Sequence, residues 1–93
     1  MIKYCKIELF TPYKIYKGNF YRTSLGFVGK SPKGVFGYDY GMFEAHKFAP
    51  EEAEAYARAC AGNYTVKIYQ YVSKGSDVRE ERPSIERVTV KLN

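Results

Sequence analysis

A nucleophile pair of cysteine and histidine is formally possible in this sequence, from Cys5 or Cys60 with the single histidine, His46. Catalytic triads are assembled in space, so either thiol could pair with the imidazole, oriented by Asp39 or Glu44. Both cysteines, however, fall on the inner side of predicted elements, where burial raises the pKa of a thiol and makes it unreactive. We therefore expect no catalysis and predict that the protein is not an enzyme.

A metal site or a bound cofactor is not expected either. Structural zinc sites use four Cys or His ligands at regular spacings, whereas this chain has only three such residues and no CxxC pair. The sequence also lacks the glycine-rich phosphate-binding motifs and the GxSxG motif of hydrolases. In a reducing cytosol, both cysteines should be free thiols.

The strongest local signal is the stretch YKIYKGNFYR, in which aromatic and basic residues are interleaved. Proteins that bind single-stranded nucleic acid stack rings on the bases and place cations beside the phosphates, and this stretch offers both. The alternative is a strand pair whose rings contact each other and whose lysines protect an edge from aggregation. We favour the second interpretation, because no RRM or KH pattern is present. The residues concerned are Tyr13, Lys14, Tyr16, Lys17, Phe20, Tyr21 and Arg22.

The net charge of +5 is concentrated in the first third of the chain. Residues 1–34 carry seven basic side chains and one acidic side chain. Such an excess favours attraction to polyanions or acidic proteins and gives no information about the fold. The chain also has ten tyrosines, six phenylalanines and no tryptophan. Because a tyrosine hydroxyl prefers water or a partner, many of these rings are expected to be partly exposed.

Length and composition indicate a single domain covering residues 1–93. With 45% apolar and 27% charged residues, the composition is ordinary for a globular protein, and the chain is long enough for one core. No apolar run approaches roughly 20 residues, the length that crosses a bilayer, and the N-terminus has no signal-peptide core. We therefore expect a soluble cytoplasmic protein with no membrane partner.

Alternation of apolar and polar residues predicts six strands. Gly26 and Gly29 indicate a bulge or the end of a strand. A turn at Lys74–Asp77 and a charged arm at Val78–Ser84 would connect the last two strands as a long hairpin. The predicted strands are Ile2–Phe10, Tyr13–Lys17, Phe20–Val28, Val35–Tyr40, Tyr64–Val72 and Ile85–Leu92.

One helix is predicted between the fourth and fifth strands. Pro50 suits its first turn, acidic residues follow where the helix dipole favours them, and Gly62 ends it. Runs of strands with one helix between them indicate the α+β class. We expect one antiparallel sheet of about five to six strands, in the order β-β-β-β-α-β-β, with the Ala-rich helix packed on one face. The inner face of the helix would consist of Ala53, Tyr56, Ala57 and Cys60.

Between Glu44 and Tyr71, the stretches HKFAPEEAEAYAR and YTVKIY resemble small orphan proteins of phages and prophages. In those proteins a sheet carries one Ala-rich helix, and some anti-CRISPR and other anti-defence inhibitors share this size and build. The resemblance covers about a third of the chain and rests on residues that place the helix, such as Phe48 and Ala53, so it transfers no functional residue. It implies a phage-type inhibitor that acts in the cytoplasm of a bacterial host.

Two functions follow as hypotheses. The first is a non-catalytic interaction protein, a phage-type inhibitor that binds a protein or nucleoprotein complex of bacterial defence through a Tyr- and Lys-rich sheet and loop surface. The second is a small basic protein that binds single-stranded nucleic acid through the N-terminal hairpin. The open face of the sheet is expected to display Tyr4, Lys6, Lys67, Tyr69 and Tyr71. With the hairpin, the predicted binding residues are Tyr4, Lys6, Tyr13, Lys14, Tyr16, Lys17, Tyr21, Arg22, Lys67, Tyr69 and Tyr71.

Overall fold

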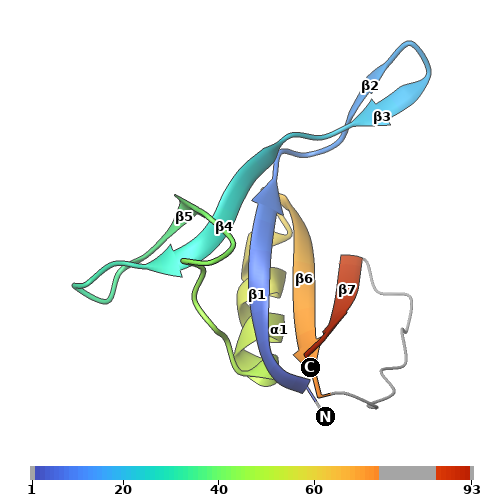
Figure 1. Ribbon diagram of the computed structural model, residues 1–93. Coiled ribbons are helices and arrows are strands. Elements are labelled where there is room, and N and C mark those ends of the chain that lie inside the picture. Colours follow the sequence, from blue (N-terminus) through green and yellow to red (C-terminus); the bar gives the residue numbers. More distant parts are fainter. Residues whose placement is uncertain (1, 74–85, 93) are drawn as a thin grey trace.

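The computed structural model of the chain describes residues 2–73 and 86–92. These residues form one helix, a five-stranded sheet and a separate two-stranded sheet, which confirms the predicted α+β class (Figure 1). The turn predicted at Lys74–Asp77 and the arm predicted at Val78–Ser84 lie outside the described residues. The elements are β1 (Ile2–Phe10), β2 (Lys14–Tyr16), β3 (Asn19–Tyr21), β4 (Ser24–Lys30), β5 (Phe36–Tyr40), α1 (Pro50–Cys60), β6 (Thr65–Val72) and β7 (Glu86–Lys91).

The five-stranded sheet has the strand order β5-β4-β1-β6-β7. β1 lies at its centre and pairs antiparallel with β4 and β6, so the sheet is mainly antiparallel, as predicted. The predicted alternation along β1 is also confirmed, because Cys5, Ile7 and Leu9 are all buried. Ile7 lies opposite the buried Ile68 of β6, so the two central strands contribute to one core on the same side of the sheet.

The predicted pairing of the last strand is wrong. β7 runs parallel to β6, with Lys67 opposite Glu86 and Val72 opposite Lys91, whereas a long hairpin would have made the two strands antiparallel. Alternation of side chains defines the two faces of a strand but not its direction. The connection between Val72 and Glu86 has the length of about a dozen residues that a parallel crossover requires.

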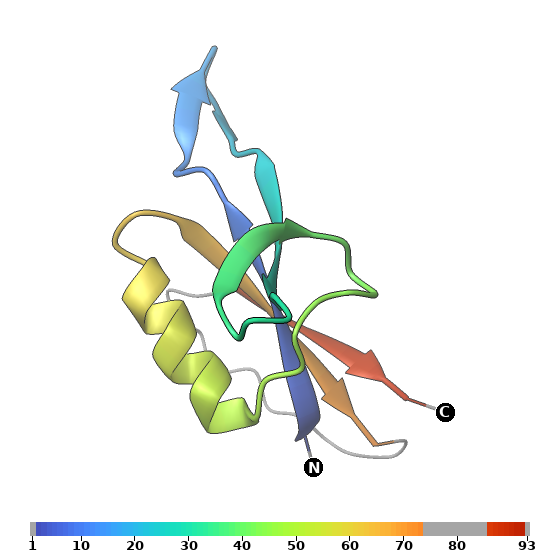
Figure 2. The same cartoon turned by 90° about the vertical axis from the view of Figure 1, so that its left-hand side faces the viewer.

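The strand predicted at Phe20–Val28 is in fact two strands, so five strands precede the helix. Pro12 has no N–H group to donate to a ladder, and the pairing of β1 with β4 stops beside it. Two hydrogen bonds close this end of the sheet. The Thr11 N–H donates to the Thr23 carbonyl oxygen (2.9 Å), and the Thr23 N–H donates to the Thr11 hydroxyl oxygen (2.9 Å). Beyond them, β2 and β3 leave the sheet as a projecting hairpin (Figure 2).

Two residues with positive φ face each other where β4 meets β5. Gly26 has a φ of 114° and Asp39 a φ of 93°. Their backbones lie so close that a Cβ atom on Gly26 would be 2.8 Å from the Asp39 Cα atom. The pairing register of β4 shifts along both of its edges in this region, in agreement with the irregularity expected at Gly26 and Gly29.

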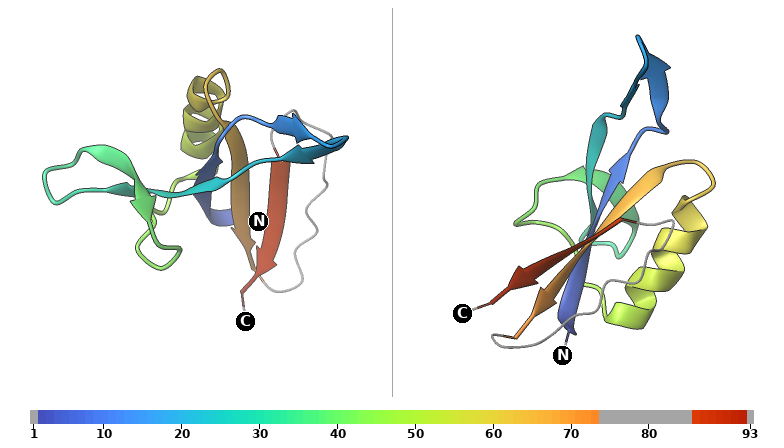
Figure 3. Two further views of the ribbon diagram at one scale, coloured as in Figure 1. Left: turned by 90° about the horizontal axis from the view of Figure 1, so that it is seen from above. Right: turned by 90° about the vertical axis from the view of Figure 1, so that its right-hand side faces the viewer.

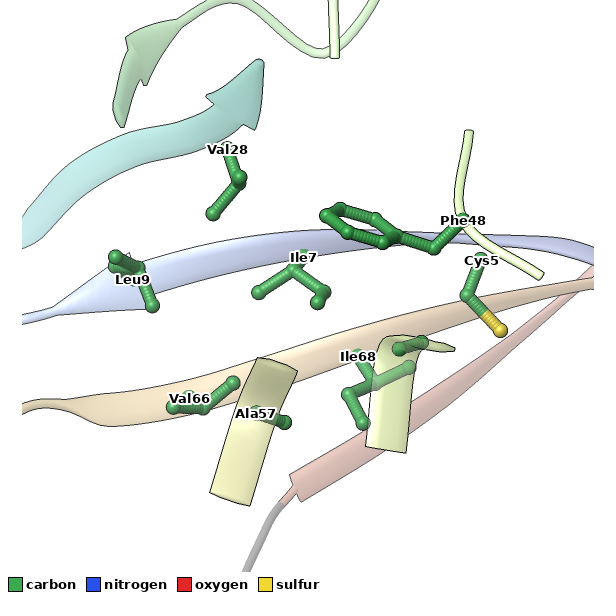
Figure 4. Packing of buried hydrophobic residues seen from close by; sticks show 9 residues of the cluster. Cys5, Ile7, Leu9, Val28, Phe48, Ala57, Val66 and Ile68 are labelled. Atoms are coloured by element: carbon green, nitrogen blue, oxygen red, sulfur yellow. The ribbon is translucent and has the colours of Figure 1, made fainter. Parts of the chain in front are cut away.

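Helix α1 covers one face of the sheet (Figures 2 and 3). Ala53 and Ala57 are fully buried, and Cys60 packs at the margin of the same core, as predicted. An ion pair between Arg87 of β7 and Glu54 links the edge of the sheet to the helix. The alanines let the helix approach the sheet closely, and the strand residues beneath it are Ile7, Leu9, Val66 and Ile68 (Figure 4).

Enlarging Ala57 to leucine should lower the free energy of unfolding by about 1–3 kcal/mol, because the added side chain overpacks the layer between helix and sheet. Urea denaturation followed by circular dichroism measures the change. Ala55 lies exposed on the outer side of the same helix, so Ala55→Leu is the matched control and should leave stability nearly unchanged. Equal stabilities of the two variants would contradict this packing.

Candidate partner-binding surface

The hairpin of β2 and β3 is the most exposed element of the described structure that carries large side chains. Its strands are joined by Lys17 and Gly18, whose φ values of 50° and 81° suit a two-residue hairpin turn. Every residue in both strands is exposed. Paired residues share a face of the ribbon, and the pairs are Lys14 with Tyr21, Ile15 with Phe20, and Tyr16 with Asn19.

One side of the hairpin, called here the apolar face, consists of Tyr13, Ile15 and Phe20. Ile15 is 70% exposed and Phe20 is 68% exposed. The Tyr13 ring meets the Phe20 ring edge to face, with 6.2 Å between the ring centroids. This contact leaves most of the apolar face in solvent.

The opposite side, called here the basic face, consists of Lys14, Tyr16, Lys17 and Tyr21. The two tyrosine rings meet at an angle of 61°, with 6.4 Å between centroids, so the predicted contact between rings of neighbouring strands is confirmed. Tyr16 nevertheless stays 62% exposed and Tyr21 52% exposed. The Lys17 ammonium lies 5.3 Å from the centroid of the Tyr16 ring. Contacts between the rings therefore leave both of them accessible to a partner.

Arg22, at the base of the hairpin, is engaged within the protein. Its guanidinium carbon lies 4.0 Å from the centroid of the Phe10 ring and 5.2 Å from that of Tyr13. It also forms an ion pair with Glu86 of β7, whose carboxylate lies 3.7 Å from the Lys67 ammonium. These contacts join the hairpin to the open face of the sheet, so the two predicted groups of binding residues are brought together here.

The expectation that the open face displays Lys6 and Tyr71 is wrong. Only 7% of Lys6 and 8% of Tyr71 is exposed. Tyr71 lies opposite Tyr4 in the β1–β6 pair, and the two rings stack with 4.7 Å between centroids. The Lys6 ammonium donates a hydrogen bond to the Met42 carbonyl oxygen (2.6 Å). Burial lowers the pKa of Lys6, and the nearby charge of Lys47 lowers it further.

Tyr69, the third tyrosine of the open face, is half-buried and is also engaged within the sheet. Its hydroxyl donates a hydrogen bond to the Glu8 carboxylate (2.6 Å), which also accepts one from the Ser24 hydroxyl (2.6 Å). Burial and the Glu8 hydrogen bond raise the pKa of Tyr69. Its ring lies 5.3 Å from that of Phe27. The open face is therefore a packed layer, and the freely exposed predicted residues are those of the hairpin.

A second exposed apolar region was not identified from the sequence. It lies along β5 and the loop that follows, on the opposite side of the molecule from the hairpin (Figure 3). Phe43 is its most exposed member, at 96%. In this region the sequence predicts the strand Val35–Tyr40 and does not identify an exposed surface. The residues are Val35, Phe36, Tyr38, Met42 and Phe43.

The candidate nucleophiles, Cys5 and Cys60, and the candidate base, His46, all lie in or beside the hydrophobic core. Burial raises the pKa of the Cys5 thiol to about 11 and also raises the pKa of the half-buried Cys60. Both thiols are free. The His46 ring packs against two phenylalanine rings, with centroids 5.2 Å from Phe36 and 4.6 Å from Phe48. These contacts give His46 a place in the aromatic packing beside the core.

Within residues 2–73 and 86–92, no group of three or more His, Cys, Asp or Glu side chains could hold a metal ion. The helix in this part of the chain is too short and too polar to cross a membrane. The chain matches no protein-family model, no curated protein and no solved structure.

Proposed function

We propose that the protein is a non-catalytic interaction protein, a phage-type inhibitor that binds a protein or nucleoprotein complex of bacterial defence. The hairpin of β2 and β3 would be its main docking element. The observation that supports this proposal is the apolar face of the hairpin, where Ile15 and Phe20 are each more than two-thirds exposed on an element that projects from the sheet. The proposal includes a site of action in the cytoplasm of a bacterial host.

The exposed apolar side chains of this hairpin are not explained by a contribution to the stability of the fold. An isolated two-stranded ribbon is marginal in water, and exposed apolar patches are a liability for solubility. The core forms between α1 and the five-stranded sheet without any hairpin residue. Exposed aromatic and aliphatic anchors on a projecting element are, in contrast, what the centre of a protein interface requires.

Charge indicates the kind of surface that the hairpin would meet. Residues 9–38 contain five basic side chains, of which Lys14 and Lys17 lie on the hairpin, and no acidic one. Arg22 is already paired with Glu86. An acidic rim around an apolar groove would complement this segment and accelerate association.

Binding of a host protein should depend on Ile15. Ile15→Ser should cost about 2 kcal/mol of binding free energy, or roughly 30-fold in affinity, if the side chain is an interface anchor. The measurement is a pull-down from nuclease-treated bacterial lysate, with the retained protein then titrated against the purified variants. Val35→Ser removes an equally exposed aliphatic side chain away from the hairpin and should bind like the parent.

An infection assay tests the inhibitory role itself. In a bacterium whose defence system restricts a phage, expression of the parent should restore plaque formation, and Ile15→Ser should restore it less well than Val35→Ser does. Restriction that is unchanged by the parent would contradict the inhibitor proposal.

The alternative function is that of a small basic protein that binds single-stranded nucleic acid. A salt titration of the complex distinguishes it from the proposed function. A protein interface dominated by apolar side chains should weaken little with salt, whereas each phosphate contact contributes about 0.7 to the log-log slope for single strands. Retention that vanishes after nuclease treatment would favour the alternative.

A further inference from the structure

We infer that the basic face of the hairpin binds single-stranded nucleic acid, with Tyr16 and Tyr21 stacking on bases and with Lys14 and Lys17 contacting phosphates. This inference rests on the proposed function and makes it more specific: of the two kinds of partner proposed, a protein or a nucleoprotein complex, it selects the nucleoprotein complex. The apolar face would then contact protein while the basic face contacts the strand. The two faces differ in the chemistry that they offer, and each can be removed without the other.

The arrangement of side chains on the basic face supports this assignment. Lys17 lies beside the Tyr16 ring, and Lys14 is the cross-strand partner of Tyr21. Each exposed ring is thus flanked by one cation. This arrangement matches the alternation of bases and phosphates along a nucleic-acid strand. The 6.4 Å between the ring centroids reflects an edge-to-face contact, so the rings do not cover each other as a parallel stack would.

The electrostatic surroundings also favour a polyanion. The acidic side chains nearest in sequence to the hairpin are Glu8 and Asp39, and the carboxylate nearest to its base is that of Glu86. Glu8 accepts hydrogen bonds from Tyr69 and Ser24, and Glu86 is paired with basic side chains. The charges of the two lysines therefore face solvent without a neighbouring carboxylate in the described part of the hairpin.

A single strand is favoured over a duplex by the rings. Paired and stacked bases do not offer a free face to an exposed tyrosine, whereas an unpaired strand does. A narrow projecting ribbon with exposed tyrosine rings can reach such bases from the end of the molecule.

Fluorescence anisotropy with a short fluorescein-labelled oligothymidylate tests the inference, using the full-length protein at low salt. Tyr16→Ala and Tyr21→Ala should each reduce affinity by about 5- to 150-fold, the loss expected for one stacked base. Val35→Ala, at an exposed aliphatic residue outside the hairpin, is the control and should bind the oligonucleotide like the parent. Thermal unfolding of each variant establishes that the fold is retained.

A salt titration of the same complex tests the phosphate contacts. Lys14→Gln and Lys17→Gln should each reduce the log-log salt slope by about 0.7. Equal affinities of Tyr16→Ala, Tyr21→Ala and the parent would overturn the inference, as would duplex DNA binding as tightly as the single strand. Binding to anionic phospholipid vesicles but not to the oligonucleotide would overturn it as well.

The outcomes also separate this inference from the proposed function. If Ile15→Ser loses the host protein while the parent fails to bind the oligonucleotide, the docking proposal stands and the nucleic-acid inference fails. If the oligonucleotide binds through Tyr16 and Tyr21 but no protein is retained after nuclease treatment, the docking proposal fails and the strand-binding face stands.

Discussion

Replacing Phe48 with alanine should lower the free energy of unfolding by about 3–5 kcal/mol, the range typical of a buried phenylalanine. Phe48 is almost fully buried, and its ring lies 5.6 Å from that of Phe36 and 5.3 Å from that of Tyr56. Its backbone also exchanges two hydrogen bonds with Cys5, each 2.8 Å long. The substitution keeps these hydrogen bonds and leaves a cavity between helix and sheet. A loss of this size is a large share of the stability of a small domain.

Urea denaturation followed by circular dichroism measures the effect, and Phe43→Ala is its control. Phe43 is of the same residue type and lies in the same connection between β5 and α1, but its side chain is exposed. Phe43→Ala should therefore change stability by less than about 0.5 kcal/mol. A Phe48→Ala variant as stable as Phe43→Ala would mean that Phe48 is not part of the core.

Replacing Gly26 with alanine should lower the free energy of unfolding by about 3 kcal/mol or more, because two unfavourable effects act at the same position. A φ of 114° is a backbone conformation that side chains with a Cβ rarely adopt. In addition, the new Cβ atom would meet the Asp39 Cα atom at 2.8 Å, and a backbone atom cannot move aside as a flexible side chain can. The pair of strands β4 and β5 would have to separate.

Gly18→Ala distinguishes the two effects. Gly18 also has a positive φ, 81°, but a Cβ atom there would have no neighbour within 4 Å. Replacing Gly18 with alanine should therefore lower the free energy of unfolding only by the cost of the positive φ, about 1 kcal/mol. The comparison is made by thermal and urea unfolding of both variants, and similar losses at the two positions would argue against close contact between β4 and β5.

Much of this fold could be predicted because local patterns determine it. The period of two in β1 and β6 assigned Ile7 and Ile68 to the core, and the spacing of Ala53 and Ala57 assigned the inner face of the helix. The direction of β7 could not be predicted in this way, since alternation is the same in parallel and antiparallel strands. The break between β3 and β4 could not be predicted either, because it depends on where the pairing of β1 with β4 stops, which is a long-range property.

The candidate surface was predictable to a similar extent. The interleaved stretch identified the hairpin and every residue of its basic face. The burial of Lys6 and Tyr71 was not predictable, because a strand pattern shows which side a residue occupies but not what packs on that side. Tyr71 is covered by its cross-strand partner Tyr4, and Lys6 reaches the carbonyl of Met42, which is distant in sequence. Phe43 was missed because its exposure is a property of the loop that carries it.

The ion pair between Arg22 and Glu86 has a consequence for the order in which the protein assembles. The two residues are 64 positions apart, so the pair can form only after β7 has joined the sheet beside β6. The local turn can close the β2–β3 ribbon early, on the time scale of hairpin formation, but its base stays without this contact until the last strand is in place. The Arg22–Glu86 pair is therefore expected among the last contacts to form, after the hydrogen bonds between Thr11 and Thr23 have closed the base of the hairpin.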